Sequence, residues 1–477
     1  MKKTLFFAAA AIAMLASCSQ NDLEAPVVAQ AQQGDAIEFG TYLGKAAGSR
    51  AGWAGDITDT ELKDNDKAKG FGVFATYTKE KNYDAAEATK LPNFMYNQRV
   101  YWDTTPDPDA WVYSPVKYWP NGLDDKQTPD AADGGDDDTF TNGGKVSFFA
   151  YAPYVTKAAA DADASTGTGI IGMSANDANT HPTITYKMAA TGQNVDLLWG
   201  TASTTAAEQS GDDLSGNKQA GRTLTGGKAS VNVDLTKQQK DGRVRFLFKH
   251  ALAKVGGAVD GLQIQLDPDE GADFGTTNKT VVTVNKIIIA KASTATKKQT
   301  GILDLATGVW SSLDGDDDFS QSIVSGTPST GELALNSKIK ESTFNDGVGE
   351  ESWGTSTGNM LADGHTGVTT TAQSVYEDNN VAPLLYFPDE TPSMDITVQY
   401  TIRTKDVNLA SGYSEVVQKV KKKVTFANTV DFNKRYTLII KLGITSVKFE
   451  AKVANWEDND DAFATDDNFV NLPLNVE

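Results

Sequence analysis

Cys18 is the residue with the most definite chemistry in this sequence. It is the only cysteine of the chain, so neither an intramolecular disulfide nor a cysteine-based metal site can form. Lys2 and Lys3 precede an apolar run over residues 5–16, which is shorter than the roughly 20 residues that a membrane helix needs. Leu15-Ala16-Ser17-Cys18 follows directly and is typical of a lipoprotein signal, in which the cysteine thiol is acylated. We expect residues 1–17 to be a signal peptide and Cys18 to be lipidated, the alternative being an ordinary secretion signal.

Residue types used in catalysis are few, and none stands in a context that would activate it. The three histidines, His181, His250 and His365, leave few possible members for a Ser-His-Asp triad or a zinc site. Residues 354–358 match G-x-S-x-G and residues 167–172 match G-x-G-x-x-G, but both lack the strand and helix that their chemistry needs. The 63 acidic residues offer many carboxylate pairs for glycoside hydrolysis, and the sequence singles out none. We expect no catalytic residue, no cofactor and no enzymatic activity; a secreted hydrolase is the weakest alternative.

The acidic residues also determine which partners are excluded. The chain has 63 Asp and Glu against 43 Lys and Arg, a formal charge of −20, which disfavours nucleic acid and anionic lipid surfaces as partners. Residues 267–270 and 314–318 are acidic runs, but neither has the alternating spacing or the closing Glu of a calcium loop. We therefore expect solvated acidic turns and no metal site, and calcium binding by the acidic loops stays open.

The elements that must position these residues are strands. Short apolar or alternating runs are separated by turn-forming stretches, and no sustained 3.6-residue periodicity is present. Parallel sheets need crossover helices, which the sequence lacks, so the pattern predicts an all-β chain of two tandem β-sandwich domains. Residues 201–240 are poor in bulky apolar side chains, which places the boundary there. We expect an N-terminal sandwich at 51–205, a linker at 206–240 and a C-terminal sandwich at 241–456.

Two segments near the ends of the mature chain carry patterns of their own. Residues 37–43 alternate like a first strand and are followed by an open, small-residue loop in which Arg50 precedes Ala51. A protease that cuts after basic residues could enter this loop, and Lys45 is a rival site.

The chain closes on an alternating segment behind an acidic spacer at 457–468. Val470, Leu472, Leu474 and Val476 form one apolar face, although Pro473 lacks a ladder N–H. Either this segment folds back as an edge strand of its own domain, or it is donated to the sheet of another molecule.

Aromatic residues cluster in the first half of the chain. They are Trp102, Trp111, Trp119, Tyr101, Tyr113 and Tyr118. They could form a stacking platform for sugars, although aromatic residues in strands more often belong to the core. His250 lies among Phe246, Phe248 and Leu252, and we expect it to be a hydrogen-bonded core residue.

Several of these motifs occur in an order that resembles the fimbrillin family of Bacteroidota. They are the lipoprotein signal, residues 37–39, Ser49-Arg50-Ala51, residues 70–75, Tyr118-Trp119-Pro120, residues 146–153, 246–255 and 300–305, and the late stretch 447–456. The resemblance covers nearly the whole mature chain. It implies two transthyretin-like β-sandwich domains and a structural, adhesive subunit of a cell-surface fimbria.

The resemblance also implies a role for each end of the chain. Cys18 would anchor the precursor to the outer membrane, cleavage between Arg50 and Ala51 would release residues 18–50 with their first strand, and 470–476 would be the donor strand for another subunit. The implied partners are other fimbrial subunits, self or paralogue, and an unknown host or bacterial surface ligand. An outer-surface glycan-binding lipoprotein that does not polymerise is the alternative. The long acidic insertions would also suit an accessory or tip subunit, and an anchor subunit would keep its lipid.

Overall fold

Strands form most of the part of the chain that can be described. The computed structural model describes residues 36–43, 55–105, 109–120, 144–164, 167–189, 194–205, 217, 219–236, 243–257, 261–270, 280–340, 367–377, 381–406, 408–443, 446–456 and 470–477. The helices in these ranges are short: α1 (Asp59–Lys63), α2 (Lys157–Asp163), α4 (Ser337–Lys340) and the 3-10 turn η1 (Pro268–Glu270). The all-β prediction is therefore confirmed.

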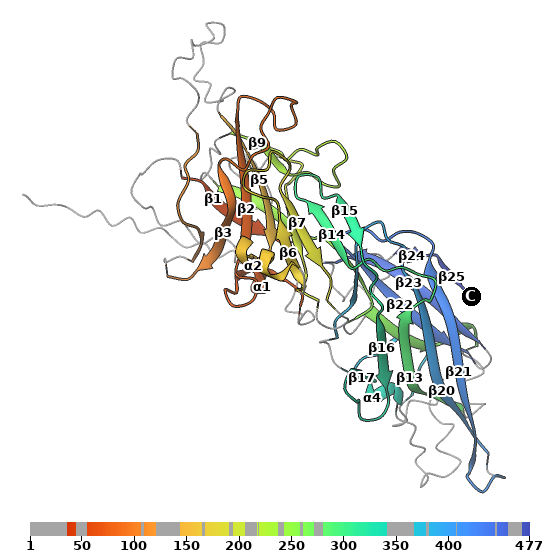
Figure 1. Cartoon of the computed structure of the whole chain (residues 1–477). Coiled ribbons are helices and arrows are strands. Elements are labelled where there is room, and N and C mark those ends of the chain that lie inside the picture. The colour runs from red at the N-terminus through yellow and green to blue at the C-terminus, as the bar shows by residue number, and fades with distance from the viewer. Residues whose placement is uncertain are drawn as a thin grey trace, which may run out of the picture.

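Two sheets form the N-terminal end of the molecule (Figure 1). The eight-stranded sheet contains, in spatial order, β1 (Glu38–Tyr42), β10 (Arg243–His250), β8 (Leu198–Thr201), β5 (Lys145–Ala152), β2 (Phe71–Lys79), β3 (Met95–Asp103) and β4 (Ala110–Val112), with β9 (Asn232–Leu235) also paired to β5. The four-stranded sheet contains β15 (Trp310–Asp314), β14 (Thr300–Asp304), β7 (Thr183–Lys187) and β6 (Gly169–Met173).

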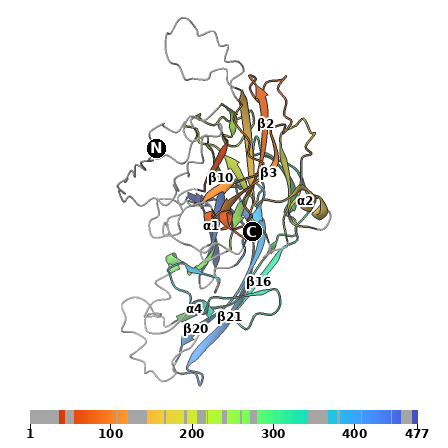
Figure 2. The ribbon, with the colours of Figure 1, turned by 90° about the vertical axis from the view of Figure 1, so that its left-hand side faces the viewer.

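Two further sheets form the C-terminal end. The seven-stranded sheet runs β18 (Gln373–Ser374), β12 (Leu262–Leu266), β22 (Lys434–Leu442), β11 (Ala253–Val255) and β19 (Leu384–Tyr386), and β23 (Val447–Asn455) pairs with both β22 and β24 (Val470–Leu472). The six-stranded sheet runs β17 (Glu332–Ala334), β16 (Ser320–Val324), β13 (Thr280–Lys291), β20 (Ser393–Lys405), β21 (Tyr413–Phe426) and β25 (Leu474–Val476). Both views place β2 and β3 toward one end of an elongated molecule and β20 and β21 toward the other (Figure 1 and Figure 2).

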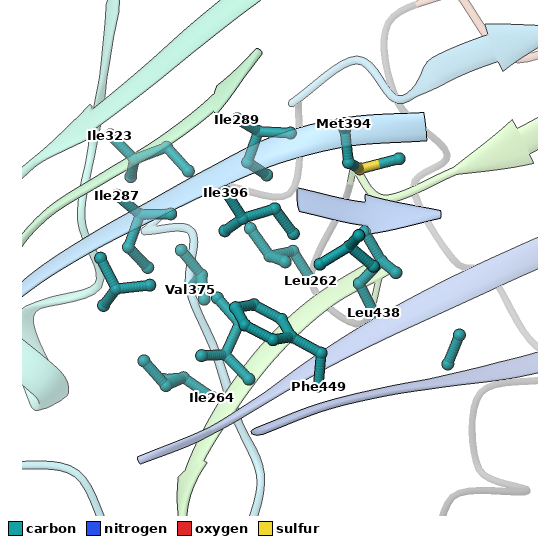
Figure 3. Packing of buried hydrophobic residues seen from close by; sticks show 14 of the residues in the cluster. Leu262, Ile264, Ile287, Ile289, Ile323, Val375, Met394, Ile396, Leu438 and Phe449 are labelled. Atoms are coloured by element: carbon teal, nitrogen blue, oxygen red, sulfur yellow. The ribbon is translucent and has the colours of Figure 1, made fainter. Parts of the chain in front are cut away.

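Each pair of sheets encloses a hydrophobic core. Between the two C-terminal sheets, Leu262 and Leu438 of one sheet face Ile287 and Ile396 of the other (Figure 3). Side chains of the eight-stranded and four-stranded sheets likewise share a core. A third cluster covers the opposite face of the eight-stranded sheet. Strands buried on both faces read as continuous apolar runs rather than as alternation, which explains the sequence Phe-Phe-Ala-Tyr-Ala in β5.

Strand pairing corrects the expected linker at 206–240. In that interval, β9 pairs with β5, and the next strand, β10, pairs with β8 in the N-terminal sheet. Farther along, β14 pairs with β7, so residues 300–304 also belong with the N-terminal strands. The chain therefore crosses between the two ends of the molecule more than once. Sequence composition cannot reveal this, because a composition shift marks a loop and not the partner of the next strand.

Candidate assembly site

Strand β1 lies at the edge of the eight-stranded sheet and is held on both sides. It pairs in parallel with β10, with Phe39 opposite Val244. On the other side, the Ile37 N–H donates to the Lys117 carbonyl at 2.9 Å, and the Tyr113 hydroxyl donates to the Ile37 carbonyl at 2.7 Å. Ile37, directly before β1, is therefore tied to the segment around 113–118, while β1 itself pairs with β10.

The inward side chains of β1 fill an apolar groove. Ile37 and Phe39 are 1% and 3% exposed. The Phe39 ring contacts four aromatic rings at centroid distances of 5.2 to 6.2 Å, those of Phe71, Tyr113, Phe148 and Phe246. Burial beside this strand raises the pKa of Tyr113 to about 12. Because all four rings belong to other elements, loss of β1 would leave their apolar surface and one edge of β10 without this cover.

The C-terminal segment is divided between two sheets. β24 pairs with β23, placing Leu472 opposite Ala451, and β25 pairs with β21, placing Leu474 opposite Phe426. The change of sheet occurs at Pro473, which separates the two strands and has no N–H for a ladder. Within this chain the segment therefore folds back onto its own domain, which was one of the two alternatives, as two short strands rather than one.

This C-terminal segment buries less of its apolar face than β1 does. Leu472 and Leu474 are half-buried against the C-terminal core, whereas Val470 and Val476 are 67% and 39% exposed. The expected apolar face thus exists, but only its two central side chains are covered. At its end, Lys423 and Glu477 exchange two backbone hydrogen bonds of 2.9 Å, and the Glu477 carboxylate also lies 2.8 Å from the Lys423 ammonium.

Cys18, Arg50 and Ala51 lie outside the described residues, but the chain just after the expected cleavage site is firmly anchored. The Asp196 N–H donates to the Gly55 carbonyl at 2.9 Å, and the Trp456 indole N–H donates to Asp56 at 3.2 Å. Residues 55–56 are thereby tied both to the start of β8 and to the last residue before the C-terminal spacer.

His250 confirms its expected role as a hydrogen-bonded core residue. Its Nδ1 lies 2.5 Å from Oδ2 of the fully buried Asp196, and its ring stacks on Trp456 with centroids 4.1 Å apart. Burial raises the pKa of the Asp196 carboxyl, while the imidazole opposes that rise. Ligand atoms of Asp56, Asp196 and His250 lie within 4.8 Å of one another, but the Lys254 ammonium already supplies a cation 3.7 Å from Asp56. Asp196 was not among the residues singled out in the sequence, because its partner lies 54 positions away.

The six aromatic candidates do not all reach the surface. Trp119 and Tyr113 are 3% and 8% exposed and belong to the core beside β1. Trp102 and Trp111 are half-buried, with their ring centroids 5.3 Å apart, and Tyr118 is exposed. A sugar platform would therefore have to be built from fewer rings than the sequence offers.

The remaining motifs have structural explanations where they are described. Residues 169–173 are β6, and a turn and β7 follow, so no helix supports the G-x-G-x-x-G interpretation; residues 354–358 lie outside the described ranges. The acidic runs are not wholly solvated, which corrects that expectation: Asp267 and Asp317 are buried and lie 2.7 and 2.8 Å from the ammonium groups of Lys448 and Lys297. Of the helices in the described ranges, none has both the length and the apolar character needed to span a membrane.

Comparisons with known proteins show which sequences and structures this chain resembles. No protein-family model matches it. Among curated proteins, the fimbrium subunit Fim1C of Phocaeicola vulgatus is 27% identical over 232 residues, which are 49% of this chain and 44% of that protein. The expected resemblance to the fimbrillin family is confirmed. The chain nevertheless spans less than half the length of this fimbrial relative.

The similarity in fold extends over more of the chain than the similarity in sequence. The crystal structure of a fimbrial protein from Bacteroides vulgatus aligns with a TM-score of 0.53 and 18% identity, covering 88% of this chain and 99% of that one. At this identity the likeness concerns the fold alone. A putative cell adhesion protein from Bacteroides uniformis also aligns, with a TM-score of 0.29 and 13% identity over 81% of this chain and 91% of that one.

Proposed function

We propose that this chain is a structural and adhesive subunit of a cell-surface fimbria and has no catalytic role. It is exported as a lipoprotein acylated at Cys18 and anchored in the outer membrane, and cleavage between Arg50 and Ala51 then removes residues 18–50. The cut releases β1 together with the lipid. The emptied groove beside β10 receives residues 470–476 of another fimbrial subunit, and repetition of this step builds the extracellular fimbrium.

The observation that carries the proposal is the contrast between the two edge strands. The groove around Phe39 is lined by rings from four other positions, so it suits an incoming strand with alternating apolar side chains. The C-terminal segment has such a face, but only part of that face is buried against its own domain. Keeping the groove filled until export and cleavage would prevent premature polymerisation.

The test uses the full precursor and a trypsin-like protease. We expect the processed protein to start at Ala51 and to form a ladder on an unboiled gel that collapses on boiling. Leu472→Asn with Leu474→Asn should abolish the ladder, because both side chains would enter the groove. The matched control, Asn471→Ala with Asn475→Ala, changes the opposite face and should keep it. A ladder that survives the double leucine change would refute the donor role, and cleavage at Lys45 instead of Arg50 would move the processing site.

The glycan-binding lipoprotein is the second candidate, and the half-buried Trp102 and Trp111 favour it. It predicts a monomer that keeps its lipid on Cys18. It also predicts that Trp102→Ala and Trp111→Ala reduce retention on a glycan array, whereas a purely structural subunit should bind no glycan with either residue.

A further inference from the structure

A lysine and an aspartate are buried together where the two ends of the molecule meet. Lys297 follows β13 and Asp317 follows β15, and they are 2% and 9% exposed. The Lys297 ammonium nitrogen lies 2.8 Å from Oδ2 of Asp317. Their backbones are held side by side, because the Asp317 N–H donates to the Lys297 carbonyl at 2.8 Å. The pair is therefore fixed in position at both the backbone and the side chains.

The surroundings of this pair are apolar on several sides. The Lys297 nitrogen lies 3.2 Å from the sulfur of Met188, a weak acceptor, and 5.1 Å from the centroid of the Tyr386 ring. The Tyr386 hydroxyl is buried and has no hydrogen-bond partner in the described part of the chain. Its pKa is raised by burial and by the nearby charges of Glu390 and Asp317. An unpaired donor thus sits close to the two carboxyl groups.

Glu390 completes the cluster. Its carboxylate accepts the N–H groups of Lys298 and Phe387 at 2.7 and 2.9 Å. Burial raises the pKa of Glu390, and the Lys297 charge opposes that rise, so the two groups act on each other. The site therefore contains an amine, a carboxyl group beside it and a second, buried carboxyl group.

A neighbouring ion pair in the same acidic run, 314–318, is not buried in this way. Lys291 and Asp316 also form an ion pair, at 2.5 Å, but the Asp316 side chain is 48% exposed. In this pair the Lys291 side chain is 10% exposed, but the Asp316 carboxylate reaches solvent, and ion pairs with a solvated member contribute little to stability. Burial of two opposite charges is costly, and a bond that removed both charges would avoid that cost.

We propose that Lys297 and Asp317 form an intramolecular isopeptide bond, an amide between the lysine Nζ and the aspartate Cγ. A nitrogen at hydrogen-bond distance from a carboxylate oxygen is close to the carboxyl carbon, near the roughly 3–3.5 Å from which attack begins. The ammonium first passes one proton to the Asp317 carboxylate. The free electron pair of the amine then forms the C–N bond, the C–O bond breaks, and the hydroxyl leaves with a second amine proton as water. One amide N–H remains, and no oxidant, metal or further reactant is consumed.

Tyr386 and Glu390 act as positioning residues in this reaction. The Tyr386 ring holds the amine against the carboxyl group, and the charge of Glu390 lies close enough to influence both Lys297 and Tyr386. The product would join the loop after β13 to the loop after β15 and pass tension between them through a covalent bond. Such a link would suit a protein under mechanical load, although its formation does not depend on the proposed fimbrial role.

The decisive measurement is the mass of the intact wild-type protein followed by fragmentation of its peptides. We expect a mass lower by one water molecule than the sequence requires, and a branched peptide that joins Lys297 to Asp317. Succinimide formation at Asp314-Gly315 gives the same mass loss, so the branched fragment distinguishes the two reactions. A full-length mass equal to the sequence mass, or a loss confined to residues 314–315, would overturn the proposal.

Variants supply a control for the bond and test whether Tyr386 and Glu390 position the reacting groups. Lys297→Met should restore the missing water, whereas Lys291→Met, at the exposed pair, should leave the loss unchanged. Tyr386→Phe and Glu390→Gln should slow the loss of water in freshly synthesised protein, which a purely structural role would not do in variants that still fold. Loss of water that persists in Lys297→Met would also refute the assignment.

Discussion

Replacing Phe39 by alanine tests the groove directly in the uncleaved precursor. The Phe39 ring is 3% exposed and contacts four other rings. Removal of a buried phenylalanine side chain costs about 3–5 kcal/mol, and an edge strand that can relax should lie near the lower value. Because β1 has a single ladder partner, β10, at the edge of its sheet, this cost should appear as local opening of β1 rather than as global unfolding. A loss of about 3 kcal/mol corresponds to roughly 100-fold faster opening, since 1.4 kcal/mol is a factor of ten.

Hydrogen exchange followed by mass spectrometry would measure this opening. Amides of β1 and of the facing edge of β10 should exchange on the order of 100-fold faster in Phe39→Ala, while the C-terminal sheets stay unchanged. Glu38→Ala is the matched control on the outward face of the same strand, where the carboxylate lies 3.4 Å from Arg243. A partly exposed pair of this kind is worth about 0–1 kcal/mol, so its loss should change exchange less than tenfold. If the amide exchange rates of β1 in Phe39→Ala stay within tenfold of those in the wild type, packing of Phe39 in the groove is not the main interaction that stabilises β1.

Two further perturbations probe the packing. Gly308 has a positive φ of 72°, and a Cβ there would lie 2.2 Å from the Trp199 ring, whereas Gly331 has a φ of 86° and open space around it. Gly308→Ala should therefore destabilise the protein by several kcal/mol more than Gly331→Ala, as measured by chemical denaturation. Equal losses of stability would mean that the Trp199 ring moves aside. Burial raises the pKa of Glu390 above its ordinary value of 4.5, so the folded protein binds this proton more tightly than the unfolded chain does. Ionisation of Glu390 should therefore lower the stability of the protein as the pH rises above 4.5. Glu390→Gln should flatten the fall in melting temperature above that pH, and an unchanged slope would contradict this assignment.

Strands with one clear pattern were predictable from sequence. The alternation of residues 394–404 predicts a strand, and the runs at 280–291 and 435–444 predict two more. The structure places β20, β13 and β22 at nearly these bounds. In each case a side-chain period of two or a short apolar run fits only one role in a sheet. The fold class follows from such local signals, because they require no knowledge of which strand pairs with which.

Partners far apart in the sequence were not predictable. The apolar pattern of residues 243–255 predicts one strand. In the structure, β10 joins the N-terminal sheet and β11 the C-terminal one, so the chain passes from one end of the molecule to the other between these two strands. The sequence predicts that Asp317, in the acidic run at 314–318, is solvated, and only the structure reveals it as one member of a buried pair with Lys297. Local sequence carries the period of an element, whereas burial of a charged side chain depends on neighbours supplied by several elements.

The two edge strands also suggest why exchange would run in one direction. Under the proposed exchange, residues 470–476 leave a site where Val470 and Val476 are 67% and 39% exposed. They enter a groove that leaves Ile37 and Phe39 only 1% and 3% exposed. Apolar surface removed from water contributes about 25 cal/mol per Å², so full burial of Val470 and Val476 in the groove would favour the exchanged position. Cleavage would then open the groove, because it removes β1, which fills that groove in the uncleaved chain.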